Sequence, residues 1–314
     1  MPDDRQDLFR YVVEEFAEDY REGEMERREF LRRMTLLGGG ALGARTLLTS
    51  LGIAGVSAAE LAQAQAAPPQ PDQASGAGMV DPQDPSIVVK PVTYEANGFT
   101  NLAYLARPVG GGNAPGVLVI HENKGLQPHI QDIARRLAKA GYVAMAPDLV
   151  SKIGGTAQYL DTARVSSYLA QTSGDEHVTN LLTALKVLEA QPGVQGVGAV
   201  GFCFGGGLTW RLSTAAPELK AAVAFYGPAP DLAKVPDIKA AVLGLYGGND
   251  TRINSGIPAL EAALKAAGTT YATKIYDGAG HAFNNDTGQG YVKAAADDAW
   301  AQTLSWFGKY LKQS

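Results

Sequence analysis

From residue 87 onward, short apolar runs alternate with stretches of helical periodicity, and this alternation restricts the possible fold more than any other feature. The run G-V-L-V-I at 116–120 is apolar without interruption, as expected of a strand that is covered on both faces. Residues 127–140 repeat apolar side chains every three or four positions. Such alternation predicts an α/β fold, with a mostly parallel sheet between two layers of helices and functional sites at the carboxyl ends of its strands.

The predicted order of elements begins with an antiparallel hairpin. Residues 87–95 and 99–107 alternate apolar and polar side chains on either side of Asn97-Gly98, a pair typical of tight hairpin turns. No repeat of solenoid period appears. Once residues 1–66 are set aside, 248 residues remain, a length that one α/β domain can use, and this domain is predicted at 87–314. Its further strands are expected at 116–120, 142–146, 197–202, 221–226, 241–246 and 271–276, and its helices at 127–140, 181–190, 205–214, 258–267 and 291–311.

The composition excludes several classes of protein. The 314 residues carry 27 lysines and arginines against 32 acidic residues, a balance that argues against a nucleic-acid-binding surface. A single cysteine excludes an internal disulfide and any zinc site built on two or more thiolates. The role of this solitary thiol therefore has to be inferred from its neighbours.

Residues 1–66 differ from the rest of the chain. They carry 8 arginines and 12 acidic residues, and ten of the acidic residues precede position 27. Apolar side chains recur among them at helical spacing, which predicts a short acidic amphipathic helix. These apolar residues are Leu8, Phe9, Val12, Val13 and Phe16. Residues 67–86 are expected to form a linker to the domain.

Two interpretations of this leader stay open. The run from Arg27-Arg28 through Phe30-Leu31, the apolar stretch 34–59 and the A-x-A sites at 62–66 resemble a cleaved twin-arginine export signal, which predicts a periplasmic or otherwise exported protein. However, Arg45 interrupts the apolar stretch, and the residues before the arginines are acidic. The alternative is a cytoplasmic protein that keeps an N-terminal helical arm, packed on the domain or on a partner subunit. An uninterrupted apolar run long enough for a stable membrane span is absent.

The cysteine lies in a pattern that indicates a nucleophile. The predicted strand at 197–202 runs into Gly201-Phe202-Cys203-Phe204-Gly205, and a predicted helix follows. This is the nucleophile-elbow pattern of hydrolases with cysteine in place of serine. A nucleophile on so sharp a turn needs small flanking residues because neighbouring backbones approach closely. A lone cysteine is more often a buried small apolar residue, but the glycine frame favours a catalytic role.

A base and an acid follow in the order that such a hydrolase requires. Asp250 comes after the strand at 241–246, and His281 comes after the strand at 271–276. Each residue alone has an ordinary structural explanation, as a turn residue or a surface histidine. Together, at the predicted edge where Cys203 lies, they indicate a triad in which His281 takes the thiol proton and Asp250 orients the imidazole.

A fourth group is expected at the same edge. His121-Glu122-Asn123 directly follows the apolar strand, so the Glu122 carboxylate is expected beside the thiol, whose proton it would hold until substrate arrives. The backbone amides of Asn123 and Phe204 are suited to an oxyanion hole. A metal site of His121 with Glu122 is rejected because adjacent strand residues point to opposite faces. His129 and His177 are expected on the surface.

These segments together resemble the dienelactone hydrolase (carboxymethylenebutenolidase) family of α/β-hydrolases. The resemblance covers roughly residues 87–312, and five segments support it in addition to Asp250. They are His121-Glu122-Asn123 with Gly125, 141–148, Gly201-Phe202-Cys203-Phe204-Gly205-Gly206, Phe225-Tyr226-Gly227 and Gly280-His281-Ala282-Phe283.

The resemblance implies hydrolysis of a small ester or lactone through an acyl-thioester on Cys203, without a cofactor or metal ion. His281 would be the base and Asp250 its partner, while Glu122 would modulate the thiol. Substrate contacts are expected from Tyr226 and from Arg252, although Arg252 could equally pair with the acid. The sequence departs from the family because no arginine follows His281 closely, which puts dienelactone itself in doubt as a substrate.

Two other functional classes compete with this hypothesis. A non-catalytic binding protein on a hydrolase fold is possible because a fold does not imply its function, although the intact triad argues against it. A thiol-based redox protein is the other alternative, since an activated thiolate also oxidises. The chain has no second cysteine to resolve an oxidised thiol, which disfavours that alternative.

Overall fold

The predicted α/β architecture is confirmed by a computed structural model that describes residues 4–66, 78–110 and 112–312. Eight strands form one sheet in the order β1-β2-β4-β3-β5-β6-β7-β8. The pairs β1–β2 and β2–β4 are antiparallel, and β3 to β8 are all parallel. The strands are β1 (Ile87–Ala96), β2 (Phe99–Pro108), β3 (Ala114–Ile120), β4 (Val143–Asp148), β5 (Val194–Phe202), β6 (Ala221–Phe225), β7 (Ala241–Gly247) and β8 (Tyr271–Tyr276).

The hairpin at the start of the domain has the turn that its sequence predicts. Asn97 and Gly98 have φ angles of 54° and 80°, and β1 pairs with β2 from Ala96↔Phe99 to Ile87↔Pro108. Positive φ at both central residues matches the right-handed twist of the flanking strands, and asparagine and glycine tolerate it.

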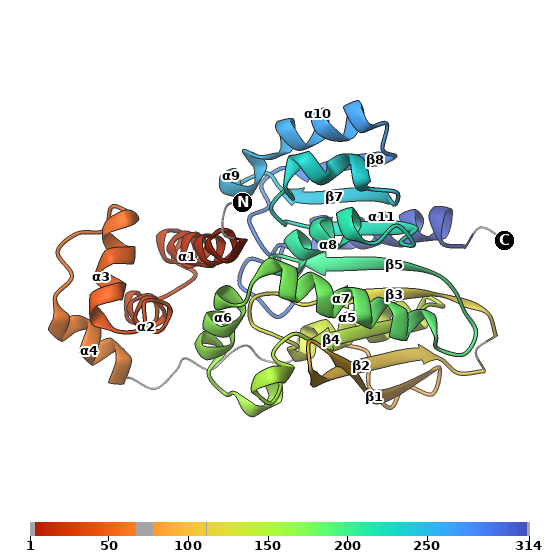
Figure 1. Ribbon diagram of the computed structural model, residues 1–314, viewed down its shortest axis with the longest axis horizontal. Coiled ribbons are helices and arrows are strands. Elements are labelled where there is room, and N and C mark those ends of the chain that lie inside the picture. The colour runs from red at the N-terminus through yellow and green to blue at the C-terminus, as the bar shows by residue number, and fades with distance from the viewer. Residues whose placement is uncertain (1–3, 67–77, 111, 313–314) are drawn as a thin grey trace.

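Helices cover both faces of the sheet. In Figure 1, α7 and α8 lie in front of the sheet, whereas α5 and α11 lie behind it. Every residue of β3, β4, β5 from Val197, β6 and β7 is buried, which explains why these strands are apolar runs rather than alternating ones. The helices of the domain are α5 (Pro128–Lys139), α6 (Thr162–Gln171), α7 (Gly174–Glu189), α8 (Phe204–Ala215), α9 (Thr251–Asn254), α10 (Ile257–Ala267) and α11 (Lys293–Tyr310), with 3-10 turns at Ser151–Ile153, Thr156–Gln158 and Leu232–Asp237.

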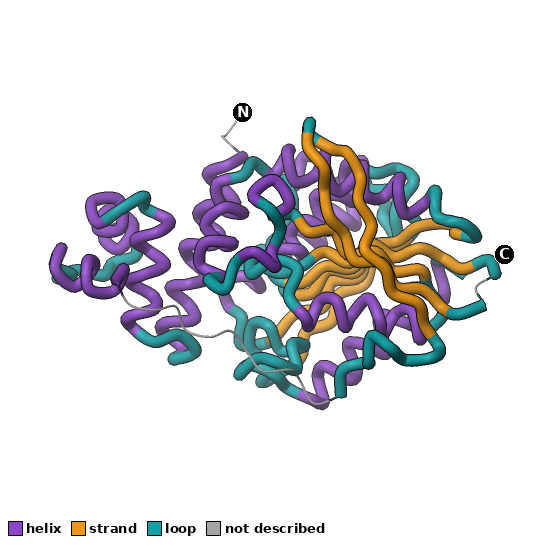
Figure 2. The backbone as a smooth tube through the Cα atoms, turned by 90° about the horizontal axis from the view of Figure 1, so that it is seen from below, coloured by secondary structure: helices purple, strands orange, loops and turns teal. Residues whose placement is uncertain are grey.

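The N-terminal segment folds into four helices beside the end of the sheet (Figures 1 and 2). They are α1 (Asp4–Glu22), α2 (Arg27–Leu37), α3 (Ala41–Ser50) and α4 (Ala58–Ala66). The predicted acidic amphipathic helix is therefore present as α1. Within the described parts of the chain, no helix has the length and apolarity that crossing a bilayer requires. Most of the predicted linker, residues 67–77, lies outside the described residues.

Candidate active site

The predicted site residues converge at the carboxyl ends of the parallel strands. Ile120 of β3 pairs with Gly201 of β5, and Phe202 of β5 pairs with Phe225 of β6. Because neighbouring strands end at nearly the same level, the residues that follow them meet at one edge. That edge carries Glu122 after β3, Cys203 after β5, Tyr226 after β6, Asp250 after β7 and His281 after β8.

Cys203 has the backbone geometry of a nucleophile elbow. Its φ is 56° and its ψ is −118°, a conformation that non-glycine residues rarely adopt. A side chain at Gly201 would collide with the carbonyl oxygen of Gly205, and one at Gly205 would collide with the carbonyl oxygens of Ile120 and His121. The glycines are thus required by close backbone approach, as the sequence pattern predicts. Phe204, the first residue of α8, has one of the N–H groups that a helix leaves without an internal acceptor.

Asp250 and His281 lie in direct contact. The Nδ1–H of His281 donates to Oδ2 of Asp250 at 2.6 Å. The other carboxylate oxygen of Asp250 accepts from the Ile253 N–H at 3.1 Å and caps α9. Burial opposes protonation of His281, but the hydrogen bond and charge of Asp250 raise its pKa. Burial likewise opposes ionisation of Asp250, but its hydrogen bond to His281 lowers the pKa of the carboxyl. The pair therefore holds the imidazole in one tautomer, with Nε2 directed away from Asp250.

Helix α1 lies across this edge and contacts the thiol. The Cys203 S–H donates to Oε1 of Glu15 at 3.1 Å, and the Tyr11 hydroxyl donates to Sγ at 3.5 Å. Glu15 Oε1 also accepts from the Asn123 side-chain amide at 2.8 Å, while its Oε2 is buried and has no hydrogen-bond partner in the described part of the chain. Cys203 is consequently only 3% exposed. The expected acceptor of the thiol proton was Glu122, but the structure gives this contact to Glu15, 188 residues earlier in the chain.

This covered state holds the thiol neutral. Burial, followed by the negative charge of Glu15, raises the pKa of Cys203 to about 12. Only the thiolate is an effective nucleophile, so this environment disfavours attack by the covered sulfur. Burial and the nearby Glu15 charge also raise the pKa of Asp19 on the same helix to about 7. Docking α1 therefore places two neighbouring carboxyl groups in a poorly solvated site.

Three donor atoms at the site could hold a metal ion. A carboxylate oxygen of Glu15, Sγ of Cys203 and a ring nitrogen of His281 all lie within 4.8 Å of one another. Thiolate, imidazole and carboxylate are ligands that zinc accepts. Two of these groups are the predicted nucleophile and base, so a metal ion here would compete with the triad.

Glu122 lies beside the thiol as expected, but its contacts are different. Its Oε2 accepts from the Asn285 side-chain amide at 3.1 Å, and its Oε1 is buried with no hydrogen-bond partner among residues 4–66, 78–110 and 112–312. The negative charge of Glu122 contributes to the raised pKa of Cys203, after burial, Glu15 and the opposing effect of His281. Asn285 was not identified from the sequence, and no local pattern indicates it.

The two predicted substrate contacts are occupied or covered. The Arg252 Nε donates to Oε2 of Glu18 at 2.7 Å, and its guanidinium lies over the Tyr11 ring at 4.9 Å. Its ion-pair partner is therefore a residue of α1, whereas Asp250 bonds to His281. Tyr226 is fully buried and its hydroxyl has no hydrogen-bond partner among the described residues. Its ring centroid lies 5.0 Å from that of His281, so it packs against the candidate base.

The expectation that His129 and His177 lie on the surface is wrong. They are 3% and 2% exposed, respectively. His129 Nδ1 donates to Asp286 at 3.2 Å, and His177 Nε2 donates to the Leu169 carbonyl at 3.1 Å. Burial lowers the pKa of His177 to about 4, so this ring is neutral at pH 7. One nitrogen of each ring has a hydrogen-bond partner inside the protein, which allows the imidazole to be buried, in the case of His177 although neighbouring polar residues are exposed.

His121 has a structural role. Its Nδ1–H donates to the Glu122 carbonyl at 2.6 Å, and its Nε2 accepts from the Leu149 N–H at 3.1 Å. Both ring nitrogens are therefore used in joining the loop after β3 to the end of β4. Burial lowers the pKa of this imidazole, which agrees with a neutral ring.

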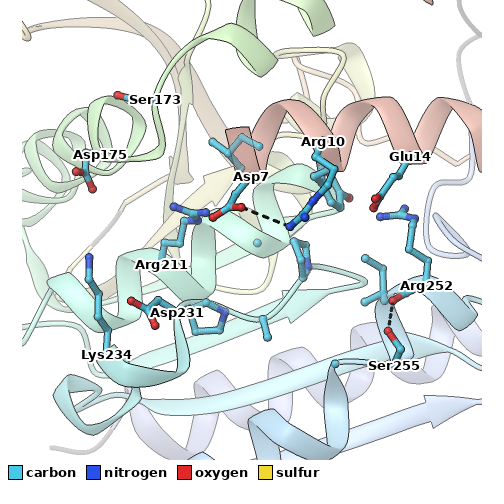
Figure 3. Close-up of a pocket in the computed structure, with 18 residues that line it drawn as sticks. Asp7, Arg10, Glu14, Ser173, Asp175, Arg211, Asp231, Lys234, Arg252 and Ser255 are labelled. Atoms are coloured by element: carbon cyan, nitrogen blue, oxygen red, sulfur yellow. Dashed lines mark hydrogen bonds and ion pairs between the residues drawn. The ribbon is translucent and has the colours of Figure 1, made fainter. Parts of the chain in front are cut away.

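Two cavities lie along the contact between α1 and the domain. The smaller measures about 60 Å³ and is lined by Glu15, Cys203 and His281 among others. The larger measures about 830 Å³, and Tyr11 and Arg252 line it but Cys203 does not. Figure 3 shows this larger pocket, with Arg10 and Glu14 of α1 on one wall and Lys234 on the opposite wall. Tyr11 contacts Sγ and lines the larger pocket, so α1 separates that pocket from the thiol.

Comparison with known proteins identifies the family. The sequence profile of the dienelactone hydrolase family matches residues 102–311. A Salmonella typhimurium protein named "Putative carboxymethylenebutenolidase" is 36% identical over 246 residues, which cover 74% of this chain and 91% of that protein. Helices α1 to α4 lie outside the residues matched by the family profile.

Two crystal structures have the same fold. The one described as "Putative Dienelactone Hydrolase" from Klebsiella pneumoniae is 33% identical, with a TM-score of 0.66, and the match covers 71% of this chain and 99% of that one. A dienelactone-hydrolase-like promiscuous phosphotriesterase from metagenomic libraries is 28% identical, with a TM-score of 0.65, and the match covers 72% and 99% of the two chains. The chain belongs to the dienelactone hydrolase family and is a hydrolase of that type.

Proposed function

We propose that the protein hydrolyses small carboxylic esters or lactones with Cys203 as nucleophile, His281 as general base and Asp250 as the group that orients it. The observation that carries this proposal is the strained elbow at Cys203 beside the 2.6 Å pair of His281 and Asp250. A strained backbone is retained where the surrounding structure enforces it, and such strain is concentrated at functional sites. The family membership supports the same chemistry.

In the first half of the reaction, His281 Nε2 accepts the thiol proton and Sγ attacks the carbonyl carbon. A C–S bond forms, and the carbonyl π electrons move to the oxygen, to which the amides of Asn123 and Phe204 would donate hydrogen bonds. As the tetrahedral intermediate collapses, the C–O bond breaks and the leaving oxygen takes the proton from His281. An acyl-thioester on Cys203 remains, and for a lactone the released hydroxyl stays attached to the acyl chain.

In the second half, water takes the place of the alcohol. His281 removes a proton from water as the oxygen attacks the thioester carbonyl, and the C–S bond breaks when the second intermediate collapses. The carboxylic acid leaves, and the sulfur regains the proton from His281. Asp250 stabilises the imidazolium in both halves. In this proposal Glu122, whose Oε1 is buried without a partner, modulates the charge on the sulfur once α1 is displaced.

A panel of short-chain esters and lactones tests the proposal. We expect Cys203→Ala and His281→Ala each to lower the turnover of the wild-type chain by about 10³-fold or more, because each removes a member of the triad. Cys203→Ser is the matched variant, since it keeps a weaker nucleophile in the same position. Equal turnover by wild type and Cys203→Ala would overturn the assignment of the nucleophile.

For the N-terminal segment we propose export, on the basis of the twin-arginine pattern. Cleavage near Ala66 would then remove α1, so the covered site at Cys203 would belong to the chain before cleavage. Arg27 and Arg28 are exposed on α2, whereas Phe30 and Leu31 of the same pattern are buried and would have to be uncovered before a receptor could bind them. The competing retained arm is supported by the packing of α1 and α2 against the domain. The N-terminus of the protein recovered from its native host distinguishes them, because export predicts a start near Ala66 and a retained arm predicts Met1 or Pro2.

A further inference from the structure

We infer that α1 is an internal inhibitor that occupies the substrate's place at Cys203 and has to leave before an acyl group can reach the sulfur. This inference rests on the proposed function of Cys203, and it adds a means by which the same site is regulated. Neither the triad nor the family membership requires it, since the family match begins at residue 102.

The first support is that α1 fills the space a substrate needs. Oε1 of Glu15 lies 3.1 Å from Sγ and 2.8 Å from the Asn123 side-chain amide, so a carboxylate already occupies the position beside the nucleophile. The cavity that remains there measures about 60 Å³. Liquid water takes up about 30 Å³ per molecule, and ligand pockets usually have volumes of about 300–1,000 Å³. The covered site therefore has room for water but not for an ester.

The second support is the contact that α1 makes with the thiol. The Cys203 S–H donates a hydrogen bond to Oε1 of Glu15 at 3.1 Å, and the Tyr11 hydroxyl donates to the same sulfur at 3.5 Å. In a working triad the thiol proton would be directed at Nε2 of His281 instead. The contact with Glu15 therefore competes with the contact to the base, and the negative charge of Glu15 opposes formation of the thiolate. A substrate's neutral carbonyl carries no such charge.

The third support is that α1 is held against the domain by side-chain packing and an ion pair, which can dissociate. Apart from the buried Glu15, the centre of the buried face of α1 is apolar, and Val12 and Phe16 there are 0% and 1% exposed. A second carboxylate, that of Glu18, pairs with Arg252 at 2.7 Å, one turn along the helix from Glu15. The helix contributes no strand to the sheet, so its departure would leave the ladder of the domain intact.

The fourth support is the pocket behind Tyr11. Tyr11 lies between Sγ and the pocket of about 830 Å³, which is large enough for a substrate. Displacement of α1 would remove Tyr11 together with the wall of this pocket that Arg10 and Glu14 form, so the domain side of the pocket would lie open beside the nucleophile. Arg252, freed from Glu18, would then face this open surface.

The test uses the full chain and its only thiol. Val12→Glu places a charge in the buried face of α1 and should displace the helix, whereas Gln6→Glu introduces the same residue at an exposed position of α1 and is the matched control. Alkylation of Cys203 by iodoacetamide at pH 8 is followed by mass spectrometry, and ester turnover is measured on the same samples. We expect Val12→Glu to raise both rates about tenfold or more, with Gln6→Glu within about twofold of wild type.

A second variant keeps the inference testable if Val12→Glu fails to fold. Glu15→Ala removes the carboxylate from Cys203 while leaving the apolar face of α1 unchanged, and Glu14→Ala is its neighbour control. We expect Glu15→Ala to alkylate about three- to tenfold faster than wild type, and Glu14→Ala to match wild type.

The outcomes separate this inference from the proposed function. Faster alkylation of Val12→Glu and Glu15→Ala without ester turnover in any variant would support the covering role of α1 and overturn the hydrolase assignment. Rapid ester turnover by wild type, unchanged by Val12→Glu, would support the hydrolase and overturn the inhibitor. Alkylation of both variants at the wild-type rate would also overturn the inhibitor.

Discussion

The hydrolase domain and helix α1 meet at Cys203, but they are held in place by different forces. In the domain, the ends of hydrogen-bonded parallel strands position Cys203, Asp250 and His281 at one edge. Helix α1 reaches the same sulfur through side chains alone, by apolar packing and ion pairs. The difference shows that the chemistry of the site and access to it are separable. The positions of the triad residues depend on backbone hydrogen bonds of the sheet, whereas access to the sulfur depends on side-chain contacts of α1 that can dissociate.

The largest expected effect concerns the domain. Asp250→Asn keeps an oxygen for the cap on Ile253 N–H but removes the charge that orients and stabilises protonated His281. We expect kcat/KM to fall by about 10³- to 10⁴-fold, as loss of the acid does in other triads. Asp84→Asn is the control, since Asp84 also accepts from a backbone N–H and pairs with Lys139 far from the site. If kcat/KM of Asp250→Asn fell no further than that of Asp84→Asn, the proposed triad would be contradicted.

The next effect concerns the attachment of the N-terminal helices. Arg32 is 6% exposed and pairs with Glu29 at 2.8 Å and Asp161 at 2.7 Å. Arg32→Met removes the positive charge that offsets the desolvation of these two carboxylates. We therefore expect the free energy of docking of α2 on the domain to weaken by about 3–5 kcal/mol. Arg164 also approaches Asp161, at 3.9 Å, but is 67% exposed, and Arg164→Met should change docking by less than about 1 kcal/mol. The rate of limited proteolysis of the N-terminal segment measures docking in both variants. Equal protection of Arg32→Met and Arg164→Met would show that the buried arginine holds α2 no more firmly than the exposed one.

A third prediction compares two helical glycines of the domain. A side chain at Gly205 would collide with the carbonyl oxygens of Ile120 and His121, so Gly205→Ala should lower the free energy of unfolding by about 2–3 kcal/mol. Gly308 in α11 has open space around it, so Gly308→Ala should raise stability by about 0.5–1 kcal/mol. Urea denaturation measures both. Effects of the same sign would show that the elbow is less tightly packed than this structure implies.

The smallest effect is the pH dependence of stability from His177. Burial lowers its pKa to about 4, so as pH falls from 7.5 to 5 the unfolded chain gains a proton that the folded ring does not. Stability should decrease over this interval by about 1–2 kcal/mol, and most of the loss should occur below pH 6.5, the ordinary pKa of histidine. His177→Gln should remove this part of the slope. The free energy of unfolding is measured by urea denaturation at each pH. If its dependence on pH is the same in His177→Gln as in wild type, the lowered pKa of His177 is not its cause.

The local features of the sequence predicted most of the domain. Asn97-Gly98 indicates its hairpin, uninterrupted apolar runs indicate buried strands, and the glycine frame of Cys203 indicates the elbow. These features are encoded by neighbouring residues, because backbone conformation and strand burial depend on local side chains. Polar residues inside the protein were harder to predict. His177 lies in a polar stretch and is nevertheless buried, because its ring donates a hydrogen bond to the Leu169 carbonyl of α6.

The sequence by itself determined the fold class, the order of the strands along the chain and the residues gathered at their carboxyl ends. It also indicated an acidic amphipathic helix near the N-terminus, but not the surface that this helix covers. Only the tertiary structure decided that Glu15 accepts a hydrogen bond from the Cys203 thiol and that Glu18 pairs with Arg252. The physical reason is that strand order and chain direction bring strand-end residues together, whereas a contact across 188 residues depends on how separate surfaces pack.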